Sequence, residues 1–168
     1  MKSFITIFAI LCLPMALFSQ DISGRWKGTI YNDSTKQSLQ YEIVINKENG
    51  RYSGFSHTWF LIGEKKYYGL KKVKVHIAKD GKVIIEDAAL LENNYPLLPD
   101  NRIRQLNVLE FREGAEPVLD GIFVTNRTKQ FNELTGRINV RRVSSITAED
   151  VTQYVQRTVQ ENNPTASK

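Results

Sequence analysis

The feature that most constrains the fold is a series of short runs in which apolar and polar residues alternate with a period of two. In the clearest run, residues 39–46, apolar side chains occupy every second position from Leu39 to Ile45. Successive side chains of a strand point to opposite faces of its sheet, so this pattern is typical of a half-buried β-strand. We expect such strands at 25–31, 39–46, 51–60, 72–77, 83–86, 103–112, 118–124 and 134–141, with 67–68 either a short strand or the start of the next one.

Short turn sequences separate these runs. Asn49-Gly50 fits the positive φ angles of a tight hairpin, and residues 79–82 give a second turn signal. Consecutive strands joined by short turns imply an antiparallel meander, which tends to close because closure removes exposed sheet edges. The prediction is an all-β fold, an antiparallel meander β-barrel of about eight strands over residues 20–145. An eight-stranded interior is either filled by side chains or holds one small ligand.

The period changes after the last predicted strand. Thr147 is a suitable N-cap, Asp150 stands where a capping box has its acidic residue, and apolar residues then recur at helical spacing. We expect a C-terminal α-helix over 146–160, packed on the barrel. The polar residues 161–168 are expected to form a disordered tail.

The first residues have the composition of a secretory signal peptide, predicted over 1–19 with cleavage after Ser19 or Gln20. A transmembrane helix needs about 20 apolar residues between anchoring charges, and Pro14 and the abrupt polar end oppose it. A lipoprotein site would need small residues before Cys12, which the sequence lacks. We therefore expect an exported protein, periplasmic or extracellular, with no stable membrane span after cleavage.

Composition excludes several classes of site in the mature chain. About 149 residues remain after cleavage, enough for one domain with a core. Cys12 is the only cysteine and lies in the leader, so disulfides, zinc–thiolate sites and a cysteine nucleophile are excluded. The formal net charge of the whole chain is +5, carried by scattered basic residues typical of a solvated surface. No nucleic-acid groove is expected, whereas an anionic glycan or lipid headgroup stays open.

The opening Gly24-Arg25-Trp26-Lys27-Gly28, the strand count and the helix after the last strand together resemble the calycin superfamily, which includes the lipocalins. The resemblance implies that Trp26 packs across the closed end of the barrel, beside a basic residue near the end of the last strand. Arg141 or Arg142 occupies that place, and we take Gly24, Trp26 and Arg141 as the structural latch of the barrel end. The chain departs from lipocalins in having no cysteine pair.

A candidate ligand site comes from strand 51–60, where Phe55, His57 and Trp59 share one face. If that face points inward, the three residues form an aromatic wall with one polar handle, the usual mixture of a small-molecule pocket. Tyr41 and Tyr67 are candidates to supply further hydroxyl groups. The alternative is an aromatic group that faces the surface or fills the core.

Catalytic and metal chemistry have little support in the sequence. His57 and His76 are the only histidines, and neither has a thiolate or carboxylate cluster around it. We expect no catalytic residues, no metal site and no cofactor. Two functions are left open: an exported lipocalin-like barrel that binds a small apolar or amphipathic ligand, or a non-enzymatic envelope or extracellular interaction protein. The second would have a filled barrel that docks a protein or polysaccharide partner through its surface.

Overall fold

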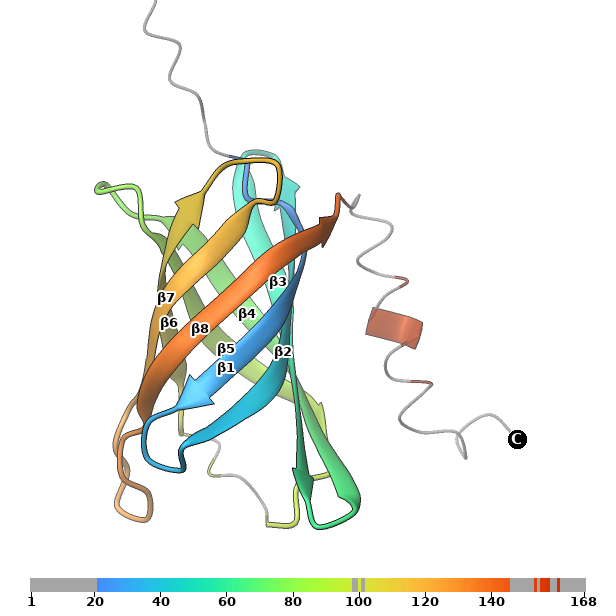
Figure 1. The fold of residues 1–168 in the computed structure, drawn as a ribbon, viewed down its shortest axis with the longest axis vertical. Helices are drawn as coiled ribbons and strands as arrows, with labels where there is room; N and C mark the ends of the chain where they lie inside the picture. The colour runs from blue at the N-terminus through green and yellow to red at the C-terminus, as the bar shows by residue number, and fades with distance from the viewer. Residues whose placement is uncertain are drawn as a thin grey trace, which may run out of the picture.

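The computed structural model describes residues 21–97, 100, 102–145, 153, 155–157 and 160, and it consists of one closed β-barrel (Figure 1). Its strands are β1 (Gly24–Asn32), β2 (Gln37–Glu48), β3 (Arg51–Ile62), β4 (Lys65–Ile77), β5 (Val83–Asn93), β6 (Gln105–Arg112), β7 (Val118–Thr125) and β8 (Thr135–Ser144). Each strand pairs antiparallel with the next, and β8 returns to pair with β1. The predicted eight-stranded antiparallel meander barrel is confirmed.

Local turn chemistry explains the hairpins. Asn49 and Gly50 have φ angles of 50° and 76°, as a tight hairpin between twisted strands requires. Gly63, with a φ angle of 61°, turns β3 directly into β4, because Ile62 pairs with Lys65. The segments expected at 67–68 and 72–77 are consequently parts of one long strand.

The two ends of the barrel differ. We call the end near Trp26 the closed end, because large apolar side chains fill it. The opposite end, the mouth, holds the β1–β2, β3–β4, β5–β6 and β7–β8 connections, which lie together at the bottom of Figure 1. Most of the buried core belongs to a single cluster that includes Ile22, Trp26, Ile43, Ile45, Val73, Val75, Val83, Ile85, Leu109, Leu119, Ile138 and Val140.

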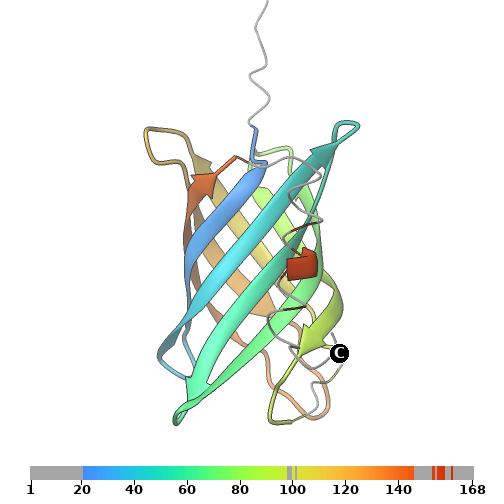
Figure 2. The same cartoon turned by 90° about the vertical axis from the view of Figure 1, so that its right-hand side faces the viewer.

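Helical geometry after β8 is described at Gln153, 155–157 and Gln160. This short segment lies outside the barrel, next to the wall that contains β3 and β4 (Figures 1 and 2). The rest of the predicted helix 146–160, the predicted signal peptide 1–19 and the predicted tail 161–168 lie outside the described residues. Among the described residues, no helix has the length and hydropathy needed to cross a bilayer.

Candidate ligand-binding site

The interior of the mouth half carries polar and charged side chains, in contrast to the apolar closed half. Cross-strand partners share a face of the sheet, so the register identifies what points inward. Ile43 of the core pairs with Ser56 on β3, and Ser56 pairs with Lys71 on β4. Val73 of the core pairs with Asp87 on β5. A serine, a lysine and an aspartate therefore face the barrel interior.

Three polar side chains form a line across the interior. The Nδ2 group of Asn107 donates to the Tyr41 hydroxyl oxygen at 3.1 Å, and the Nε2 group of Gln105 donates to Asn107 Oδ1 at 2.8 Å. Tyr41 and Asn107 are 3% and 2% exposed. Burial and the nearby Asp87 carboxylate raise the pKa of Tyr41 well above its usual value. Tyr41 therefore stays a neutral hydroxyl at any physiological pH.

The second interior feature is an ion pair between Lys71 Nζ and Asp87 Oδ2, 2.6 Å apart. The same carboxylate oxygen accepts the backbone N–H of Gln105 at 3.2 Å. That N–H needs a side-chain acceptor because the β5–β6 pairing ends at Glu86 and Leu106. The Lys71 side chain is 24% exposed although it points inward, so solvent reaches this part of the interior.

Aromatic side chains surround the mouth above these polar groups. The rings of Phe60 and Tyr67 stack with centroids 5.5 Å apart, and Tyr95 lies 5.7 Å from Phe60. Tyr95 comes from the β5–β6 connection and its ring covers Gly69, where a Cβ atom would overlap the hydroxyl group. Burial, together with the Asp87 charge, raises the pKa of Tyr95 to about 12. The interior thus combines an aromatic rim with a deeper polar network.

The structure places Phe55, His57 and Trp59 on the outer face of the barrel, so the predicted inner aromatic wall is wrong. Their partners on β2 are Val44, Glu42 and Gln40, whereas the inward residues of β3 pair with Ile43 and Ile45. Of the five predicted ligand residues, only Tyr41 and Tyr67 belong to inward-facing positions. They lie with the interior network and with the aromatic rim, respectively.

The side chains on the outer face around His57 are buried rather than exposed to solvent. His57 is 3% exposed, and its ring lies 3.7 Å from that of Trp59 and 5.9 Å from that of Tyr68. Val44 and Leu70, on the same wall, are at most 1% exposed. Burial, with a smaller contribution from the Lys66 charge, lowers the pKa of His57 to about 4.

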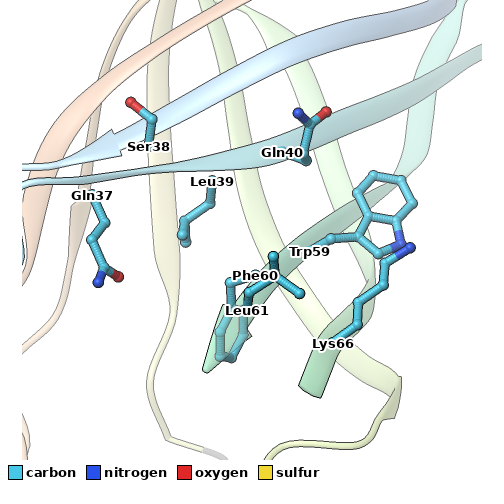
Figure 3. Close-up of a pocket in the computed structure, with 8 residues that line it drawn as sticks. All are labelled: Gln37, Ser38, Leu39, Gln40, Trp59, Phe60, Leu61 and Lys66. Atoms are coloured by element: carbon cyan, nitrogen blue, oxygen red, sulfur yellow. The ribbon is translucent and has the colours of Figure 1, made fainter. Parts of the chain in front are cut away.

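A slot opens in the barrel wall between β2 and β3 (Figure 3). The β2–β3 pairing ends at Gln40 and Trp59, after which β2 follows β1 and β3 follows β4. The resulting pocket has a volume of about 490 Å3. Its lining combines apolar and polar side chains from both strands and from the start of β4: Gln37, Ser38, Leu39, Gln40, Trp59, Phe60, Leu61 and Lys66.

The predicted latch at the closed end is present with one correction. Trp26 is fully buried, and its Nε1 group donates to the Ile22 carbonyl at 3.1 Å. The guanidinium of Arg142 lies 4.6 Å from the centre of the indole, within cation–π range. Arg141 instead forms an exposed ion pair with Glu116, because neighbouring strand residues point to opposite faces. Arg142, not the Arg141 chosen from sequence, completes the latch.

Sequence reasoning missed Lys71, Asp87, Gln105, Asn107 and Tyr95. A signal for two of them was present in the alternation itself. Extending the apolar face of 73–77 by two residues reaches Lys71, and extending that of 83–85 reaches Asp87. A charged residue that continues the period-two pattern of an apolar face indicates either an interior polar site or the end of the strand. For Lys71 and Asp87 it indicates an interior polar site.

Comparison of the chain with protein-family models, with curated proteins and with solved structures finds no match in any of the three. The barrel itself is compatible with a calycin-like fold. Within the described residues, no three His, Cys, Asp or Glu side chains are grouped closely enough to hold a metal ion.

Proposed function

We propose that this protein is an exported, lipocalin-like barrel that binds a small amphipathic molecule in the mouth half of its interior. The observation that carries the proposal is the inward-facing Lys71–Asp87 pair, which solvent reaches and which lies beside the Tyr41–Asn107 hydrogen bond. Asp87 has a structural role as the acceptor of the Gln105 N–H. Filling the barrel does not account for Lys71, because desolvating the two charges of an ion pair offsets most of their attraction.

The arrangement sets the chemistry of the ligand. Phe60, Tyr67 and Tyr95 offer apolar contact near the mouth, and the deeper groups offer one ammonium, one carboxylate, a hydroxyl and amides. Aromatic rings near the mouth with convergent polar groups below them suit a molecule with an apolar body and a polar head. The head would exchange hydrogen bonds with Lys71 and Asn107.

Native mass spectrometry of the exported protein, purified without detergent, tests for a resident ligand. We expect an extra mass of a few hundred daltons that is lost on denaturation. The second measurement uses the fluorescent amphipathic anion 8-anilinonaphthalene-1-sulfonate as a probe of the interior.

Lys71→Met and Lys72→Met form a matched pair for the probe experiment, because Lys72 is the exposed neighbour on the outer face. We expect Lys71→Met to weaken probe binding at least about tenfold and Lys72→Met to leave it unchanged, since charge-assisted hydrogen bonds contribute about 1.5–3 kcal/mol. Equal effects of the two variants, or no probe binding with no extra mass, would contradict an interior site.

The slot in Figure 3 favours a second candidate, recognition of a polysaccharide through the barrel surface. It presents the partly exposed Trp59 indole beside the Gln40 amide, with the Gln37 amide at the other end of the slot. An aromatic face with a neighbouring amide suits a sugar ring, which has apolar C–H faces and hydroxyl edges. Titration of neutral oligosaccharides while recording Trp fluorescence tests it, and Trp59→Phe should weaken any response.

A further inference from the structure

The mouth differs from the closed end in what its connections expose. Leu61 and Ile62 at the β3–β4 tip are 65% and 54% exposed, Leu97 in the β5–β6 connection 77%, and Phe131 in the β7–β8 connection 43%. The described connections at the closed end, residues 49–50, 78–82 and 113–117, hold no exposed large apolar side chain. Three neighbouring loops at one end therefore project apolar side chains into solvent.

Charge follows the same asymmetry. The four mouth connections hold five basic and four acidic residues, a net charge of +1, and Lys65 and Lys66 follow at the start of β4. The three connections at the closed end hold two basic and three acidic residues, a net charge of −1. The apolar tips and the positive charge thus share one end of the barrel.

A hollow of about 600 Å3 adds a place for an anion among these loops. It is lined by Arg102, Asn126, Arg127, Thr128 and Lys129, with Phe131 two residues beyond. Thr128 Oγ1 accepts the N–H of Phe131 at 3.1 Å, which fixes the loop that carries the two exposed cations Arg127 and Lys129. Asp100 binds Arg102 through two hydrogen bonds of 2.9 and 2.8 Å and neutralises its charge, so the net positive charge of the residues that line the hollow comes from Arg127 and Lys129.

We propose that the mouth docks on an anionic lipid bilayer, with the apolar tips inserted between headgroups and a lipid phosphate in the hollow. Peripheral membrane surfaces combine these elements: apolar side chains that reach the acyl boundary and cations that attract anionic headgroups. The slot between β2 and β3 opens beside the inserted Leu61, which gives an apolar ligand a lateral path out of the bilayer. Docking itself needs no interior ligand, so the inference goes beyond the proposed function.

Site-specific fluorescence tests which end of the barrel meets the bilayer. In a Cys12→Ser background, Leu61→Cys, Phe131→Cys and, at the closed end, Ala115→Cys are each labelled with an environment-sensitive nitrobenzoxadiazole. With phosphatidylglycerol vesicles we expect a blue shift at positions 61 and 131 and none at 115. The predicted leader peptide does not affect this comparison, because binding through it would not bury the mouth labels.

Charge variants test the headgroup contact. Each basic residue near an anionic surface contributes about 1 kcal/mol, so Arg127→Ala with Lys129→Ala should lower the partition coefficient onto these vesicles about 30-fold. Lys79→Ala with Lys82→Ala, at the closed end, is the matched control and should change it less than twofold.

Three results would overturn membrane docking: no blue shift at the mouth labels, equal shifts at both ends, or equal binding to phosphatidylcholine vesicles. Each of these leaves the interior-site experiments with Lys71 and Lys72 untouched, so the two proposals fail separately.

Discussion

Trp26 is the residue on which the closed end depends. Its indole is fully buried, meets Phe111 edge-on at 6.0 Å and donates its N–H to Ile22. Large-to-small changes of buried aromatic residues cost about 3–5 kcal/mol, and we expect this loss for Trp26→Ala in chemical denaturation. The other tryptophan, Trp59, lies on the outer face, and Trp59→Ala should cost clearly less. An unfolding free energy for Trp26→Ala within 1 kcal/mol of wild type would contradict a structural role for Trp26 at the closed end.

The two neighbouring arginines near the end of β8 give a second test at this scale. Arg142 covers the rings of Trp26 and Phe111 and donates to the Asp21 carbonyl, so Arg142→Ala should cost about 1–2 kcal/mol. The Arg141–Glu116 pair is exposed on both sides, so Arg141→Ala should cost less than about 0.5 kcal/mol. Thermal melts of the two variants compare them directly. A larger loss of stability for Arg141→Ala than for Arg142→Ala would indicate that Arg141 is the latch residue.

His57 makes stability depend on acid pH. The pKa of His57 falls from 6.5 to about 4 on folding, mainly because of burial. Above pH 6.5 the imidazole is therefore neutral in both the folded and the unfolded protein. As the pH falls from 6.5 to 4 the unfolded chain takes up the proton first, and the native state loses stability over that window. One pKa unit corresponds to about 1.4 kcal/mol, so the loss approaches about 3 kcal/mol.

The measurement is the difference in unfolding free energy between wild type and His57→Gln at pH 7 and at pH 4. His76→Gln removes the exposed histidine and serves as the control, because it should not alter this difference. An NMR titration that finds His57 protonated at pH 6 would contradict the burial of its imidazole.

At the scale of the element, β3 shows what alternation can and cannot predict. The first tight hairpin was predictable because Asn49-Gly50 acts locally, and β2 was predictable because apolar residues occupy every second position from Leu39 to Ile45. In β3 Phe55, His57 and Trp59 lie on the outer face, whereas the inward positions between Tyr52 and Phe60 hold the small residues Gly54, Ser56 and Thr58. The alternation therefore led to the wrong assignment of the inner face of β3. The outer face of this strand is buried around His57, and its inner face has small residues because bulky side chains of other strands lie opposite.

Gly54 illustrates the same constraint. It pairs with Ile45, and a Cβ atom at this position would overlap the carbonyl oxygen of Val44 on the neighbouring strand. A glycine inside a strand often marks such a close approach of two backbones.

Gly54→Val should therefore destabilise the barrel by about 1–3 kcal/mol or more, the usual cost of overpacking. Gly114→Val is the control, because nothing lies within 4 Å of its added Cβ atom and the residue is in the β6–β7 turn. Urea titration measures both variants. A tolerated valine at position 54 would mean that β2 and β3 separate more easily than their register indicates.

At the scale of the whole molecule, the barrel has a stability gradient along its axis. The closed half contains the continuous apolar core, whereas at the mouth the β2–β3 and β5–β6 pairings stop before the strands end. Local opening is favoured where cross-strand bonds and apolar contacts are few. The interior polar site lies in this less stable half.

The hydrogen bond between Asn107 and Tyr41 could not be predicted from the sequence, because the two residues are 66 positions apart in the chain.

Native-state hydrogen exchange measures this gradient. We expect the slowest amides in the core segments 43–45, 83–85 and 138–140, which should exchange only through global unfolding. Amides in 37–39 and 60–62, beside the slot, should exchange on average about 100-fold faster. Uniform protection along β2 and β3 would show that the slot is closed in solution.

An even number of strands in a meander brings the start of β1 and the end of β8 to the same end, here the closed one (Figure 1). Strands of 8 to 13 residues, tilted as in other eight-stranded barrels, separate that end from the mouth by about 30 Å. If the protein were attached to a surface through the chain before Asp21, its mouth would therefore face away from that surface. Held in this way on one surface, the barrel would present its mouth to a second surface opposite.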